Sequence, residues 1–197
     1  MVNGGAISNN EVSRLTMSNT TVDGNTASGD GGGLYHTSTI SAAVSASTIS
    51  GNQAANGGGL STLGPIALTN VTVSGNSASV NGGGLHNTAA ATLLGVTIAN
   101  NMATGSGGGI SSSTVGSNAS LKNTIVARNT ATTTTPDVNG TAFLNLGNNL
   151  IGDIGTVTTT FVNNVNGNQV GNTAAPIDPL LSPLQDNGGE TLTHALL

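Results

Sequence analysis

The sequence predicts an all-β fold, a parallel β-helix (solenoid) with coils of about 25 residues and three short strands in each coil. The first observation is a glycine triplet followed by Leu or Ile, whose starts lie 26, 25 and 25 residues apart, at 31–34, 57–60, 82–85 and 107–110. The second is a Thr-Val-Ser-Gly-Asn-like motif that keeps the same period, at 21–25, 48–52, 72–76 and 97–101. Two motifs with one period indicate a stacked repeat.

Residues 57–81 show how one coil is expected to form. Its glycine triplet is predicted to bend the chain, because glycine permits positive φ and close backbone approach. Leu60 starts a short strand, and residues 66–69 and 71–74 alternate apolar with polar or small residues, which is typical of half-buried strands. Each strand then pairs with its counterpart one coil later, about 4.8 Å along the axis.

The inward-facing apolar residues predict three ladders whose burial, at about 25 cal/mol per Å², stabilises the fold. One ladder contains Val22, Ile49, Val73, Ile98 and Val126. A second contains Leu34, Leu60, Leu85 and Ile110. A third, looser ladder contains Leu15, Met17, Val44, Ile66, Leu68, Leu93 and Leu121.

Asparagine occupies one turn position in five successive coils, as Asn25, Asn52, Asn76, Asn101 and Asn129. Stacked amides can hydrogen-bond along the axis and satisfy polar groups of the turn. We interpret this row as a structural ladder; the alternative is a row of ligand-binding amides.

The repeat divides the chain into three predicted parts. Residues 1–135 are expected to form regular coils, residues 136–174 irregular closing coils, and residues 175–197 a Pro-containing extended tail or cap. Three leucines of the tail are expected to cover the end of the solenoid: Leu180, Leu181 and Leu184. No basic-then-apolar leader opens the chain, so we expect a fragment of a longer protein that carries an export signal and an anchor elsewhere.

Composition and charge exclude several kinds of partner. The net charge is −5, with only Arg14, Lys122 and Arg128 positive, so nucleic acid and an anionic membrane surface are not expected partners. No apolar run approaches the roughly 20 residues of a spanning helix, so no membrane insertion is predicted for this segment. The chain has no cysteine, which excludes disulfides and thiolate chemistry, and no cofactor is expected.

Several segments also resemble known bacterial proteins. The glycine triplet with Leu and the Thr-Val-Ser-Gly-Asn turn resemble the right-handed parallel β-helix repeats of polymorphic outer-membrane-type and pectin-lyase-like surface proteins. More distinctive segments look like choice-of-anchor Q domain proteins, at 123–127, 136–138, 146–152, 176–181 and 184–197. The resemblance implies a right-handed β-helix that is extracellular or on the bacterial cell surface. It carries over no catalytic residue.

The acidic residues give little support for an enzyme. Polysaccharide lyases need clustered carboxylates and a base, and hydrolases need a pair of carboxylates. Only Asp23 and Asp30 lie near each other within a coil; with Arg14 and Tyr35 they are our carbohydrate-site candidates. No catalytic residue and no metal site are predicted, because only one carboxylate precedes the four glycine triplets, in the set Asp30, Asn56, Asn81 and Ser106.

Histidines and threonines add two observations. His36 and His86 follow their glycine triplets at different offsets and His194 is remote, so we expect solvated or capping roles for all three. Outward-facing threonine is favoured in strands, but a regular column can also match an ice lattice: Thr21, Thr48, Thr72 and Thr97.

These observations favour a non-catalytic, exported or cell-surface β-helix that acts as a structural stalk, passenger or adhesin. A surface glycan or a host or partner protein is the expected partner. The alternative is a polysaccharide-binding or polysaccharide-cleaving β-helix, a lyase or a glycoside hydrolase if it is an enzyme. Minor alternatives are an ice-binding face and a fibre-forming subunit whose strand edges stack on one another.

Overall fold

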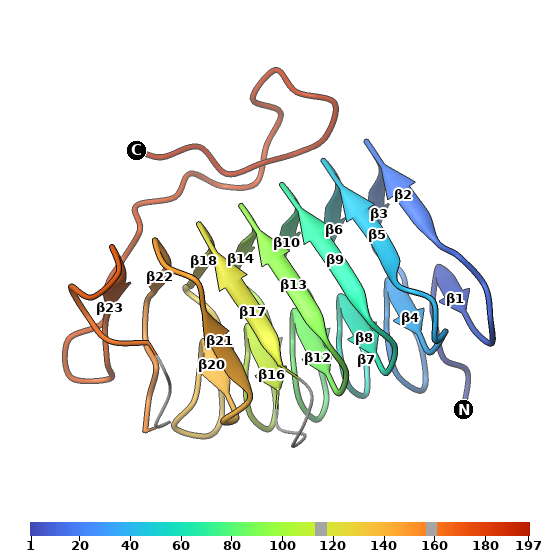
Figure 1. The fold of residues 1–197 in the computed structure, drawn as a ribbon, viewed down its shortest axis with the longest axis horizontal. Helices are drawn as coiled ribbons and strands as arrows, with labels where there is room; N and C mark the ends of the chain where they lie inside the picture. The colour runs from blue at the N-terminus through green and yellow to red at the C-terminus, as the bar shows by residue number, and fades with distance from the viewer. Residues whose placement is uncertain (113–117, 157–160) are drawn as a thin grey trace.

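The computed structural model describes residues 1–112, 118–156 and 161–197. Within these residues, 23 strands form four parallel sheets and no helix occurs. The sheets stack into a solenoid whose coils follow one another along its long axis, with the N-terminal coil at the right of Figure 1. The predicted all-β solenoid is therefore confirmed. The described residues contain no apolar helix of membrane-spanning length.

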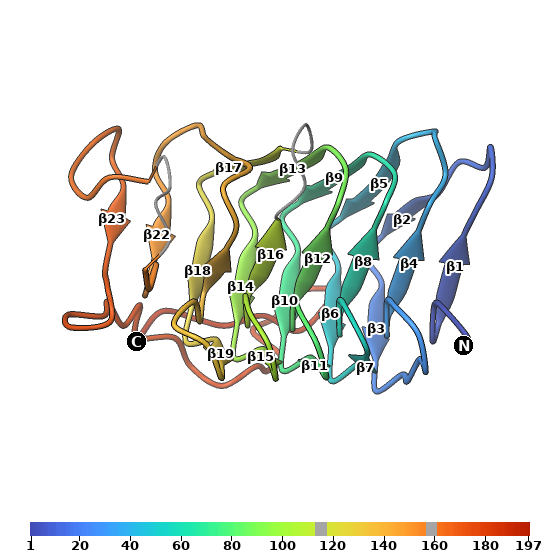
Figure 2. The same cartoon turned by 90° about the horizontal axis from the view of Figure 1, so that it is seen from below.

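Two six-stranded sheets follow the glycine triplets along the chain. Sheet A contains β1 (Ile7–Asn9), β4 (Leu34–His36), β8 (Leu60–Thr62), β12 (Leu85–Asn87), β16 (Ile110–Ser112) and β20 (Val138–Asn139). Sheet B contains β2 (Thr16–Ser18), β5 (Ala42–Ser45), β9 (Ile66–Thr69), β13 (Ala91–Leu94), β17 (Ala119–Lys122) and β21 (Phe143–Asn145). Figure 2 shows the same stack turned by 90°.

The other two sheets contain and follow the Thr-Val-Ser-Gly-Asn motif: its first three residues form sheet C, and sheet D begins after its asparagine. Sheet C has seven strands: β3 (Thr21–Asp23), β6 (Thr48–Ser50), β10 (Thr72–Ser74), β14 (Thr97–Ala99), β18 (Ile125–Ala127), β22 (Leu150–Ile151) and β23 (Gln169–Val170). Sheet D has four two-residue strands: β7 (Gln53–Ala54), β11 (Ser77–Ala78), β15 (Met102–Ala103) and β19 (Thr130–Ala131). Sheet D adds a short fourth strand where the sequence indicates only a turn.

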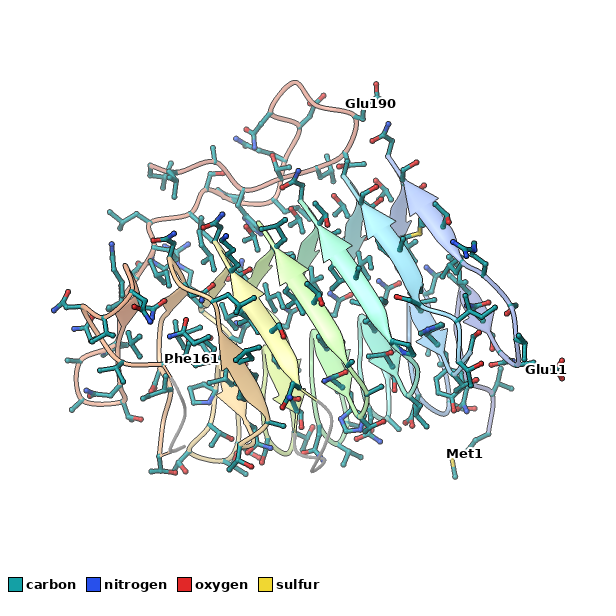
Figure 3. The ribbon with its side chains drawn as sticks, viewed as in Figure 1. Met1, Glu11, Phe161 and Glu190 are labelled. Atoms are coloured by element: carbon teal, nitrogen blue, oxygen red, sulfur yellow. The ribbon has the colours of Figure 1, made fainter. Side chains whose placement is uncertain are left out.

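The core consists of the predicted aliphatic ladders. Parallel pairing aligns Val73 with Ile49 and Ile98 in sheet C, and Leu85 with Leu60 and Ile110 in sheet A. The third ladder is a double row in sheet B, because Ile66 and Leu68 both point inward and are buried. At the C-terminal end, Phe143 and Phe161 are buried with ring centroids 5.7 Å apart, and Phe161 is labelled in Figure 3.

The glycine triplets are needed because the coils approach closely. Gly57 has a φ of 63°, in the left-handed region that favours glycine. A Cβ atom on Gly58 would collide with the backbone carbonyl of Ser77 in the neighbouring turn. Side chains at these positions would therefore separate adjacent coils.

The C-terminal tail does not cover the end of the solenoid as we expected. It doubles back and crosses the outer face of sheet C towards the N-terminus, above the strands in Figure 1. Leu181 is buried there, whereas Leu180 is exposed. The outward side chains of sheet C are small and mostly hydroxylated, so the backbone of the tail can lie close to them. The proposed division at residues 135 and 174 stays a prediction, and residues 157–160 lie outside the described residues.

Candidate functional site

The asparagine row forms a continuous hydrogen-bonded ladder inside the turn between sheets C and D. At each step, the backbone N–H and the Nδ2 amide donate to the Oδ1 atom of the next member at 2.9–3.0 Å, from Asn25 through Asn52, Asn76 and Asn101 to Asn129. The Nδ2 amide of Asn76 also donates to the carbonyl of Ile49 at 2.9 Å. All members after Asn25 are buried, and the amides are engaged with one another, which supports the structural interpretation over a ligand-binding one.

The ladder ends on a carboxylate. Asp137 Oδ1 accepts the backbone N–H of Asn129 at 3.0 Å and its Nδ2 amide at 2.8 Å, while Oδ2 accepts the N–H of Asp153 at 2.6 Å. Asp137 is only 2% exposed. Burial raises the pKa of Asp137 to about 6, and the hydrogen bonds from Asn129 and Asp153 oppose this rise.

In the sequence, Asp137 is one of eight scattered acidic residues and belongs to none of the repeated motifs. The register aligns Val138 with Ile110, so Asp137 occupies the position of the third glycine of a triplet. An acid at that position is a signal that could have identified it. The missing glycine triplet in this coil concealed the alignment.

A pocket of about 330 Å³ lies beside Asp137, between the last coils and the start of the tail. It brings together Arg128, Asp153 and Asp178, three charged residues that lie far apart in the sequence. The guanidinium of Arg128 donates through Nε and Nη2 to the two carboxylate oxygens of Asp178, at 2.7 and 3.0 Å. Its Nη1 donates to the carbonyl of Leu181 at 2.8 Å. The hydrogen bond from Arg128 lowers the pKa of Asp178.

The acids of this pocket are occupied by structural contacts. Asp153 Oδ1 accepts the N–H of Gly155 at 2.7 Å and the hydroxyl of Thr173 at 3.2 Å. Asp137 receives three N–H groups, so its ionised form is held by donors and its protonated form would lack an acceptor for its own proton. Among the described residues, no group of three His, Asp or Glu side chains could hold a metal ion. The pocket is a joint between the coils and the tail.

The four predicted carbohydrate-site residues do not converge. Asp23 Oδ1 accepts the hydroxyl of Ser50 at 2.6 Å on sheet C. Asp30 Oδ1 accepts the Nδ2 amide of Asn56 at 3.0 Å in the turn before sheet A. Tyr35 lies on the outer face of sheet A, and Arg14 is exposed between β1 and β2. Two other acids lie in separate loops, as Figure 3 shows for Glu11 and Glu190.

The outer face of sheet A carries a row that sequence reasoning did not assemble. Parallel pairing places Ser61 between Tyr35 and His86, and Ser61 is wholly buried. The Oγ atom of Ser61 and the Nδ1 atom of His86 are the two buried side-chain atoms of the described residues that lack a hydrogen-bond partner. Burial lowers the pKa of His86, and the nearby charge of Asp30 opposes this shift. We call Tyr35, Ser61 and His86 the ring row.

His36 is not solvated, contrary to our expectation. It points inward from β4 and is 0% exposed. Its Nδ1 lies 3.0 Å from the amide nitrogen of Asn9, and its Nε2 lies 2.9 Å from the carbonyl of Pro65. These partners fix a neutral ring that donates from Nε2 and accepts at Nδ1. Burial lowers the pKa of His36, and the bond to Pro65 opposes this.

The threonine column of sheet C is not an open face. Thr48 is 0% exposed and Thr72 is 7% exposed, whereas Thr21 is exposed. The tail covers this part of the sheet, and the hydroxyl of Thr48 donates to the carbonyl of Leu192 at 2.6 Å. A flat ice-binding face along this column is therefore absent from the described structure.

Three segments of the chain match the Chlamydia polymorphic membrane protein (Chlamydia_PMP) repeat, at residues 19–37, 70–88 and 95–113. Each segment runs from the turn before a sheet C strand through the glycine triplet and the sheet A strand that follows. No curated protein and no solved structure shows significant similarity to the chain. Repeats and solenoid together fit a β-helix of the polymorphic membrane protein type. The resemblance to choice-of-anchor Q domain and pectin-lyase-like proteins stays a prediction.

Proposed function

We propose that this chain is a non-catalytic β-solenoid displayed on a bacterial surface, where it serves as a passenger or stalk. The observation that carries the proposal is the continuous stack of coils, whose repeats match those of polymorphic membrane proteins. The buried asparagine ladder supports a stiff, elongated unit, because each of its hydrogen bonds contributes about 0.5–1.5 kcal/mol. The acids of the pocket beside Asp137 serve structural contacts, which favours a scaffold over a reaction centre.

Antibodies against the purified chain, applied to cells of the organism that encodes it, test this proposal. We expect intact cells to be labelled, and external protease to remove the label without lysis. An antibody against a cytoplasmic protein is the control for cell integrity. Labelling only after permeabilisation would contradict surface display.

A second candidate function is binding of a polysaccharide along the outer face of sheet A. The ring row favours it, since the rings of Tyr35 and His86 are partly exposed on one face, two coils apart in the same register. Aromatic rings pack against the apolar faces of ligands, so two partly exposed rings on one face can hold a sugar chain.

A panel of immobilised glycans, read for both binding and cleavage, tests this second function. If a glycan binds, Tyr35→Ala is expected to weaken binding about tenfold, while the matched control Tyr35→Phe keeps the ring and most of the affinity. Equal binding by both variants would show that the glycan binds elsewhere than at the ring row. Release of shorter fragments by the wild-type chain would overturn the non-catalytic assignment.

A further inference from the structure

The tail forms a hairpin that is closed on itself. We call residues 181–197 the tail hairpin. Its two arms are joined by antiparallel bridges between Leu181 and Leu196 and between Gln185 and Thr193. The backbone groups of Gln185 and Thr193 exchange hydrogen bonds at 3.1 and 3.0 Å, and the N–H of Ser182 donates to the carbonyl of Ala195 at 2.8 Å. The hairpin can therefore move as one unit.

Polar contacts hold the tail hairpin against the outer face of sheet C. The hydroxyl of Thr48 donates to the carbonyl of Leu192, and Nε2 of His194 lies 2.9 Å from the hydroxyl of Ser74. Most residues of the hairpin are exposed, and Leu181 is its one buried apolar side chain in the described structure. A segment with so few buried apolar contacts opens more readily than the core.

The connection to the hairpin is short and strained. The N–H of Ile177 donates to the carbonyl of Gly152 at 2.9 Å, which fixes the chain to the last coils. Three residues later, Leu180 has a φ of 52°, in the left-handed region that is unfavourable for a residue with a Cβ atom. Strained short hinges favour the exchange of a segment between two copies of a protein, because opening relieves the strain.

We propose that the outer face of sheet C is a docking surface for the tail hairpin of a second copy of this chain. In the exchanged dimer, each hairpin makes the contacts with Thr48 and Ser74 that it now makes within its own chain, and the hinge at Leu180 is released. Reciprocal exchange closes a two-fold dimer with no free hairpin. This inference goes beyond surface display and differs from stacking through strand edges, since it uses the face of a sheet.

Cross-linking between two differently labelled copies tests the exchange. The chain has no cysteine, so single-cysteine variants react at one position only. Ala46→Cys lies beside sheet C and Thr191→Cys on the hairpin, where the Thr191 hydroxyl is 3.5 Å from the carbonyl of Ala46. The two variants are mixed at high concentration and treated with a short bismaleimide. A cross-linked heterodimer is expected.

A double variant, Ala46→Cys with Thr191→Cys, is the control, because its cysteines cross-link whenever a hairpin is docked, within one chain in the monomer or between two chains in the exchanged dimer. Cross-linking in the double variant and none in the mixture would overturn the proposal. A negative cross-linking result would not contradict surface display, because antibody labelling of intact cells tests surface display separately.

Two substitutions at Leu180 are expected to shift the ratio of dimer to monomer in opposite directions. Leu180→Pro fixes φ near −65° and is incompatible with the docked hinge, whereas Leu180→Gly adopts positive φ without strain. By light scattering, we expect the ratio of dimer to monomer to differ between the two variants by about 5- to 30-fold, with the proline variant more dimeric. A proline variant that stays monomeric, with a protease-sensitive hairpin, would contradict exchange.

Discussion

The asparagine ladder continues through the middle coils, and at the C-terminal end of the solenoid it stops at a side chain from a different position of the coil. In the middle, Asn76 accepts two hydrogen bonds from one coil and donates two to the next. At the end, Asp137 accepts from Asn129 and, when ionised, has no proton to pass on. Continuing a stack requires a side chain that both donates and accepts, while ending it requires one that only accepts.

The residue that follows a sheet C strand also differs between the middle coils and the C-terminal end. The residue after each of the sheet C strands from β3 to β18 has positive φ, and in the middle coils it is a glycine or asparagine, as at Gly75 and Asn100. In the coil next to the tail this residue is Arg128, with a φ of 59°. Arg128 adopts this unfavourable backbone conformation at the point where its side chain forms the bidentate contact with Asp178. The preference for glycine or asparagine at this positive-φ position is therefore lost where the coils meet the tail.

The largest effect is expected from breaking the ladder in its middle. Asn76→Ala leaves the backbone N–H and Nδ2 amide of Asn52 without their acceptor. Because each buried unpaired group costs about 1–3 kcal/mol, the free energy of unfolding should fall by about 4 kcal/mol, measured by urea titration. Asn25→Ala is the matched control, since no earlier amide of the described chain loses an acceptor, and should cost about 1 kcal/mol. Equal losses would contradict the ladder.

The end of the ladder should differ from its middle in its pH dependence. The pKa of Asp137 is raised from 3.8 to about 6, so the folded state binds more protons than the unfolded state between these values. The stability linked to this group is fully present below pH 3.8 and is lost as the pH rises through 6.

Unfolding at pH 4 and pH 7 measures this contribution. We expect Asp137 to add about 2 kcal/mol at pH 4 relative to pH 7, and Asp137→Asn to remove that difference. A variant with the same pH dependence as the wild type would show that other groups titrate in this range.

A smaller effect should distinguish covered from uncovered threonines in one column. Thr48→Val removes the hydrogen bond to Leu192 beneath the tail and should cost about 1 kcal/mol in urea unfolding. Thr21→Val lies on the exposed strand β3 and should stay within about 0.5 kcal/mol of the wild type. Equal effects would argue that the tail does not cover Thr48 in solution.

The smallest global effect is expected at Arg128. Arg128→Ala breaks an exposed ion pair, so the free energy of unfolding should change little. The backbone amides of the tail hairpin should nevertheless exchange hydrogen faster, because the bond from Arg128 to the Leu181 carbonyl is lost. Lys122→Ala, on sheet B, is the control and should leave that exchange unchanged.

The sequence predicted the regular coils well because their contacts repeat the same residue types at one period. The repeat alone aligns Leu60 with Leu85 and Asn52 with Asn76, and the strand register and the amide hydrogen bonds follow that alignment. Sheet D was missed because its strands have two residues and look like part of a turn.

The region around the tail was harder to predict, since its contacts join residues that lie far apart in the sequence. Arg128 meets Asp178 across 50 residues, and Thr48 meets Leu192 across 144. No periodicity relates such partners. The ring row was missed for a milder reason: Tyr35 and His86 lie two coils apart, and their shared register appears only when the strands are aligned.

The repeated ladder step also makes the length of this protein adjustable. The junctions from Asn52 to Asn76 and from Asn76 to Asn101 have the same geometry, so a deletion of residues 77–101 would join two equivalent turns. Such a deletion would shorten the rod by one coil, about 4.8 Å, without leaving an amide unpaired. Duplications of one coil would lengthen the rod in the same increments, because every added asparagine would find the same donors and acceptors in its neighbours.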